Sequence, residues 1–146
     1  MLIFMGKFSV WGGRLSREKP KVVVIDADRQ DGRQLCDLLQ DLNYSVSLIH
    51  SLKDLEQELH KDPEVAVILD LDTVPVNNQF FRGLKKIHPQ LHMLGVSKLS
   101  YHPGLEEVIG SHLFACLAKP LDIEELCFML KSISENLSSP ARVTEA

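Results

Sequence analysis

Four polar residues that could do chemistry together each follow a short apolar run in this sequence: Asp26, Asp70, Ser97 and Lys119. Carboxylates, a hydroxyl and an ammonium group suit phosphoryl chemistry, because a carboxylate can attack phosphorus while the other groups hold the phosphoryl oxygens. We predict that Asp70 is the nucleophile and becomes an acyl phosphate. Lys119 then supplies a positive charge to one oxygen, and Ser97 donates a hydrogen bond to another. A lone aspartate after a strand often only begins a polar loop, so the prediction requires that the four side chains meet in space.

Such an attack also needs a counter-charge, because the nucleophile and the phosphoryl group are both anionic. Mg²⁺ would supply it, since this cation prefers carboxylate and carbonyl oxygens. The predicted ligands are Asp26, Asp70 and Asp72, the last through its side chain or its backbone carbonyl. Without a cation these aspartates repel one another, and Lys119 offsets only part of that repulsion.

Four apolar runs rich in branched side chains, and one run that alternates polar and apolar residues as an edge strand would, predict the five strands of the fold. The runs are residues 21–25, 45–49, 65–69, 91–96 and 113–117. Apolar residues at helical spacing follow each run and predict five helices. Each predicted helix has an inward-facing apolar side. One residue from each of these sides, in chain order, is given by the list Leu39, Leu55, Phe81, Val108 and Leu130. Asp28 is the predicted N-cap of the first helix.

The alternation of strands and helices predicts an α/β fold with a doubly wound, parallel, five-stranded sheet. Right-handed crossovers place helices on both faces of such a sheet. The carboxyl ends of the strands then share one edge, which is where open α/β sheets bind ligands. We therefore expect the four polar residues to converge at that edge.

Length, composition and charge limit the classes of function. A chain of 146 residues suits one domain. We divide the chain into a loosely ordered extension at 1–20, the folded domain at 21–136 and a polar tail at 137–146. The net charge of −4 argues against direct nucleic-acid binding, which needs clustered Lys and Arg. The apolar residues 1–5 are too few for a membrane span and lack the pattern of a signal peptide, so we expect a cytoplasmic protein.

Residues 21–133 resemble a response-regulator receiver domain of two-component signalling. The features in the family's order and spacing are Asp26, Asp70, Ser97 and the Lys119-Pro120 pair. The resemblance implies a flavodoxin-like (βα)5 fold with strand order 2-1-3-4-5 and Mg²⁺ dependence. It also implies a phosphorelay in which a histidine kinase or a phosphotransfer protein passes a phosphoryl group to Asp70. A downstream protein partner or output domain would read the result, and homodimer formation is left open.

Several positions depart from the receiver pattern. Ala27 stands where the family has a second acid that binds the metal directly, and the long Lys98 stands where a small residue gives the phosphodonor access. Pro75 lies five residues after Asp70 instead of four, and Cys116 replaces the switch aromatic. An alternative is therefore a degenerate receiver that binds proteins independently of phosphorylation.

A third alternative comes from the run of residues 70–74, Asp-Leu-Asp-Thr-Val, which is similar to the nucleophile motif of haloacid-dehalogenase-type phosphatases. In such an enzyme Asp72 would be the general acid and base. That family needs a further acidic pair on a strand after the lysine, whereas this chain has only Asp122, Glu124 and Glu125 at a helix start. We therefore expect that the chain is not an enzyme.

Overall fold

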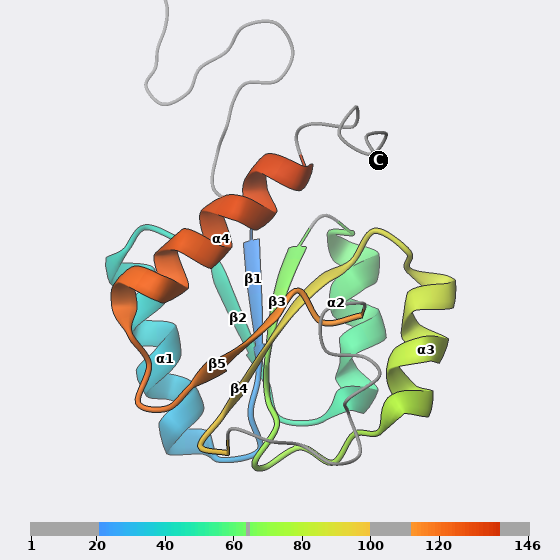
Figure 1. Cartoon of the computed structure of the whole chain (residues 1–146), viewed down its shortest axis with the longest axis horizontal. Helices are drawn as coiled ribbons and strands as arrows, with labels where there is room; N and C mark the ends of the chain where they lie inside the picture. The colour runs from blue at the N-terminus through green and yellow to red at the C-terminus, as the bar shows by residue number, and fades with distance from the viewer. Residues whose placement is uncertain (1–20, 64, 100–111, 138–146) are drawn as a thin grey trace, which may run out of the picture.

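The structure is a computed structural model that describes residues 21–63, 65–99 and 112–137. Its centre is a five-stranded parallel sheet with helices on both faces (Figure 1). The strands are β1 (Lys21–Ile25), β2 (Val46–Ile49), β3 (Val65–Asp70), β4 (His92–Ser97) and β5 (Ala115–Ala118). The helices are α1 (Arg29–Asp41), the 3-10 turn η1 (Leu52–Asp54), α2 (Leu55–Lys61), α3 (Asn78–Ile87) and α4 (Ile123–Leu137). The strands lie in the order β2-β1-β3-β4-β5, which confirms the predicted α/β fold and strand order.

The sheet is buried on both faces because its central strands are almost wholly apolar. Val23 and Ile25 of β1 face the core under α2 and α3, whereas Val22 and Val24 face the core under α1 and α4 (Figure 1). This alternation follows from the pleat of a strand. Because every pair of neighbouring strands is parallel, all the carboxyl ends share one edge, which is where open α/β sheets bind ligands.

Short connections at this edge hold the strand ends close to the helix starts. Asp28 caps α1 as predicted, since its side chain accepts hydrogen bonds from the backbone N–H groups of Gln30 and Asp31, each at 3.0 Å. Only residues 26–28 therefore connect β1 to α1. Asn77 caps α3 in the same way, by accepting a hydrogen bond of 2.9 Å from the N–H of Phe80.

The last strand begins later than the predicted run at 113–117. Leu113 is buried in the core, as a strand residue would be, but it precedes the regular strand, which starts at Ala115. Its apolar side chain therefore resembles a strand residue in sequence without being part of β5. Ala118 of β5 pairs with Ser97 of β4, and this register places Lys119 directly beyond the sheet.

Some predictions fall on residues that the structure does not describe. They are the extension at 1–20, the helix containing Val108 and residues 138–146 of the tail. Within the described ranges, no helix combines the length and apolarity needed to cross a membrane.

Candidate functional site

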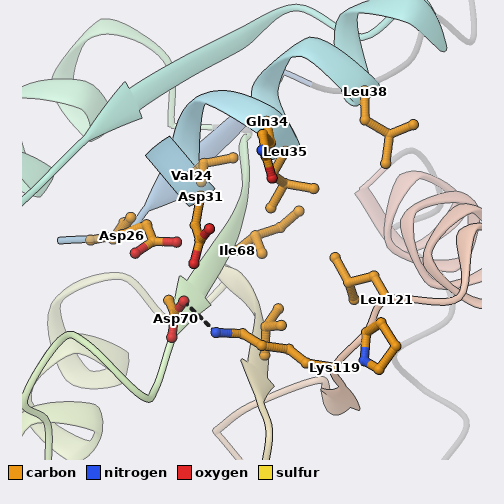
Figure 2. A pocket seen from close by; sticks show the side chains of 13 residues that line it. Val24, Asp26, Asp31, Gln34, Leu35, Leu38, Ile68, Asp70, Lys119 and Leu121 are labelled. Carbon is orange, nitrogen blue, oxygen red and sulfur yellow. Dashed lines mark hydrogen bonds and ion pairs between the residues drawn. The ribbon is translucent and has the colours of Figure 1, made fainter. Parts of the chain in front are cut away.

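The four polar residues singled out in the sequence all lie at the carboxyl edge of the sheet. Asp26 directly follows β1, Asp70 ends β3, Ser97 ends β4 and Lys119 directly follows β5. The Nζ atom of Lys119 lies 2.7 Å from Oδ2 of Asp70, whose side chain is only 6% exposed. Figure 2 shows Asp26, Asp70 and the end of the Lys119 side chain around a common space.

Asp72 is turned towards the β4 and β5 side of this edge. Its Oδ1 atom accepts a hydrogen bond of 2.7 Å from the Ser97 hydroxyl. Its Oδ2 atom accepts one of 3.0 Å from the backbone N–H of Lys98 and lies 3.1 Å from Nζ of Lys119. Lys119 therefore bridges two carboxylates, those of Asp70 and Asp72, and Ser97 contacts the second of them.

These contacts control the protonation of the site. Burial alone would raise the pKa of Asp72, but hydrogen bonds from Ser97, Lys98 and Lys119 lower it to about 2. Burial would lower the pKa of Lys119, yet its hydrogen bonds to Asp70 and Asp72 outweigh this and raise it. The pKa of Asp26 shifts in the opposite direction to that of Asp72, because burial and the neighbouring charge of Asp70 raise it. At neutral pH, Asp72 is a carboxylate and Lys119 is an ammonium.

The lowered pKa of Asp72 predicts a dependence of stability on pH. Its folded-state pKa of about 2 lies below the ordinary value of 3.8, so ionised Asp72 stabilises the fold above that value. This contribution is lost as the pH falls from 3.8 towards 2. Urea unfolding at a series of pH values should show a smaller loss of stability over this window for Asp72→Asn than for the unaltered chain. Asp37→Asn is the control that should keep the original slope, and identical slopes for all three proteins would contradict the prediction.

Thr73 was missed as a site residue in the sequence. Its hydroxyl donates a hydrogen bond of 3.0 Å to Oδ1 of Asp26 and accepts one of 3.1 Å from the N–H of Ala27. Oδ1 of Asp26 also accepts a hydrogen bond of 2.9 Å from the N–H of Asp28. Thr73 therefore ties the loop after β3 to the loop after β1. The sequence signal was its place in the run at 70–74, and nothing there indicated a partner 46 residues away.

The carboxylates of Asp26 and Asp70 are two candidate ligands for a cation. Burial of the two carboxylates side by side raises the pKa of Asp26, and a cation between them would relieve that repulsion. Mg²⁺ commonly binds through one or two carboxylates and keeps several waters, so Asp26 and Asp70 fit weak binding. Ala27 supplies no side-chain ligand, and among the described residues no group of three or more His, Cys, Asp or Glu could hold a metal.

A cavity of about 380 Å³ lies beside Asp70, between α1 and the segment after β5. Asp26, Asp70 and Lys119 lie at one end, and Leu38 and Leu121 lie at the other (Figure 2). The cavity offers room next to the Asp70 carboxylate. A small molecule of matching size could reach Asp70 from there.

The comparisons with known proteins found similarity to this chain in structure only. No protein-family model and no curated protein matches the sequence. The signal receiver domain of an HD domain-containing protein from Pseudomonas fluorescens Pf-5 superposes with a TM-score of 0.70 at 20% identity, over 84% of this chain and 99% of that one. A response regulator receiver domain protein from Clostridium thermocellum gives a TM-score of 0.71 at 17% identity, over 82% and 97%.

The beryllofluoride-activated NtrC4 receiver domain dimer is also similar, with a TM-score of 0.68 at 18% identity, over 80% of this chain and 98% of that one. Each of these similarities spans nearly the whole of the solved chain. The predicted flavodoxin-like arrangement is confirmed. This chain has the fold of a response-regulator receiver domain.

Proposed function

We propose that the chain acts as a receiver domain in two-component signalling and accepts a phosphoryl group on Asp70 from a histidine kinase or a phosphotransfer protein. The observation that carries this proposal is the contact of 2.7 Å between Nζ of Lys119 and Oδ2 of Asp70. It places a fixed positive charge beside a buried carboxylate at the edge where such sheets bind ligands. Asp26 and Ser97 lie at the same edge.

The proposed step transfers a phosphoryl group from a histidine nitrogen to a carboxylate oxygen of Asp70. A carboxylate oxygen of Asp70 attacks phosphorus in a phosphohistidine, so an O–P bond forms and the N–P bond breaks. The electron pair of the broken bond stays on the imidazole nitrogen, which takes a proton from water. The ammonium of Lys119 stabilises the charge on the phosphoryl oxygens. Mg²⁺, when held by Asp26 and Asp70, would add counter-charge.

The test is incubation with acetyl phosphate over a range of Mg²⁺ concentrations, followed by intact mass measurement. We expect a gain of a single phosphoryl group that is absent from Asp70→Asn. Asp37→Asn removes the same charge from an exposed position on α1 and should still be phosphorylated. No gain in a folded protein, or a gain that persists in Asp70→Asn, would contradict the proposal.

Restoring the absent acid should strengthen metal binding. In Ala27→Asp, a third carboxylate would join Asp26 and Asp70, and we expect Mg²⁺ to bind roughly tenfold more tightly. Isothermal titration calorimetry of the two folded proteins measures this difference. Unchanged affinity would show that residue 27 does not face the cation.

A second candidate function is a degenerate receiver that binds a protein partner without phosphorylation. It is favoured by Ala27, which offers no ligand, and by the Asp72 carboxylate, which already occupies the hydrogen-bond donors of Ser97 and Lys98. Under this candidate, the intact mass stays unchanged at every Mg²⁺ concentration while the fold is retained.

We propose further that the chain is not an enzyme. The pKa of Asp72, about 2, argues against the phosphatase alternative, because at neutral pH this residue has no proton to give to a leaving group. Hydrolysis of a small phosphate ester that required both Asp70 and Asp72 would overturn this.

The proposed partners are a histidine kinase or phosphotransfer protein and a downstream protein or output domain, with no direct contact to nucleic acid. The net charge of −4 supports the last point. A cytoplasmic location fits partners of this kind. Homodimer formation is a further option, since the similar NtrC4 receiver domain is a dimer in its beryllofluoride-activated form. Analytical ultracentrifugation with and without acetyl phosphate measures the oligomeric state.

A further inference from the structure

We propose that the Asp72 carboxylate is a built-in substitute for a phosphoryl group: it occupies the donors that would otherwise hold phosphoryl oxygens, so a phosphoryl group on Asp70 must displace it. This inference rests on the proposed function and adds a regulatory role for Asp72. The donors are the Ser97 hydroxyl at 2.7 Å, the backbone N–H of Lys98 at 3.0 Å and Nζ of Lys119 at 3.1 Å. We call these three groups the oxyanion cradle.

The cradle is built for an anion with several oxygens. Ser97 is fully buried, and its oxygen accepts a hydrogen bond of 2.9 Å from the N–H of Leu99, so its own proton is directed at Asp72. The backbone N–H of Lys98 is fixed by the chain, and Lys119 contributes charge. Hydrogen bonds to an ionised acceptor are about twice as strong as neutral ones. A cationic or apolar group would leave all three donors without an acceptor.

The cradle lies next to the proposed acceptor. Nζ of Lys119 contacts both Oδ2 of Asp70 and Oδ2 of Asp72, at 2.7 and 3.1 Å. The N–H of Asp72 also donates a hydrogen bond of 2.8 Å to Oδ1 of Asp70. A phosphoryl group attached to Asp70 would therefore place its oxygens near the donors that Asp72 now holds. The two anions would compete for the same donors and repel each other.

Two consequences follow from this competition. Asp72 opposes phosphorylation of Asp70, because its hydrogen bonds to the cradle must break before the phosphoryl oxygens can bind there. Asp72 also holds the Ser97 hydroxyl and the Lys98 backbone N–H in place when Asp70 is not phosphorylated. The two donors are therefore positioned before any phosphoryl group arrives.

The first test measures the rate of phosphorylation by acetyl phosphate in three folded proteins. Asp72→Ala empties the cradle, and we expect phosphorylation to be roughly tenfold faster or more, given the strength of hydrogen bonds to charged groups. Asp37→Ala, which removes the same charge from an exposed position, should react at the original rate. A rate for Asp72→Ala at or below that of the unaltered chain would overturn the inference while leaving the proposed function intact. Asp72→Asn keeps the shape of the side chain and should show a smaller gain, which covers the case in which Asp72→Ala fails to fold.

The second test does not require phosphorylation. In an Asp70→Asn background, inorganic phosphate is titrated while the backbone amide signals of Lys98 and Leu99 are followed by NMR. With Asp72→Ala added, phosphate should shift these signals and saturate at a concentration roughly tenfold lower than in Asp70→Asn alone. If both proteins respond alike, or neither responds, the cradle does not bind an oxyanion and the inference fails. If phosphate binds as expected but no variant is phosphorylated, the cradle stands and the proposed function fails.

Discussion

Replacing Lys119 with methionine is expected to lower the free energy of unfolding by about 2–4 kcal/mol at neutral pH. Methionine keeps much of the length of the side chain but removes the ammonium that bridges Asp70 and Asp72. Removing one partner of a buried ion pair costs about 3–5 kcal/mol, because the other charge is left uncompensated. The lower estimate applies here because the Lys119 side chain is 21% exposed and water screens part of the effect. Urea unfolding followed by circular dichroism measures the loss.

Two further variants separate this charge effect from a general effect of the substitution. Lys131→Met makes the same change at an exposed position on α4 and should stay within about 0.5 kcal/mol of the original stability. Adding Asp70→Asn to Lys119→Met should restore part of the loss, since it removes one of the carboxylates left without a partner. The electrostatic account would be wrong if both lysine variants lost the same stability, or if the double variant recovered nothing.

Phe81→Ala is expected to cost about 3–5 kcal/mol of folding stability. Phe81 belongs to α3, is 1% exposed and packs in the core that α3 and α2 form with the sheet. Truncation removes buried apolar area and leaves a cavity that the surrounding side chains fill only in part. Typical domains have net stabilities of about 5–15 kcal/mol, so this single change should remove a large part of the total.

Phe128→Ala is the matched control, because Phe128 lies on α4 with 64% of its surface exposed. Its loss should change the stability by no more than about 0.5 kcal/mol. Thermal and urea unfolding of both variants test the contrast. Equal losses for the two phenylalanines would show that Phe128 is covered in solution or that the packing of Phe81 is misassigned.

The helices and strands were largely predictable because their signals are local. The buried runs of β1, β3 and β4 are apolar on both faces, which only a sheet covered on both sides tolerates. Asp28 was identifiable as a cap because its side chain bonds N–H groups two and three residues along the chain. The predicted strand at 113–117 began too early, because β5 starts at Ala115. Leu113 is apolar and buried without belonging to β5, and an apolar residue of this kind looks the same in sequence as a strand residue.

The sequence by itself determined the parallel fold, the shared edge and the placing of Asp26, Asp70, Ser97 and Lys119 along it, since strand pattern and crossover handedness leave few other topologies. Only the tertiary structure decided that Asp72 turns towards Ser97 and Lys98 and that Thr73 binds Asp26. Those contacts join residues at least 25 positions apart in the chain. Which donor a loop carboxylate reaches depends on the packing of three separate strand ends, and no local pattern records it.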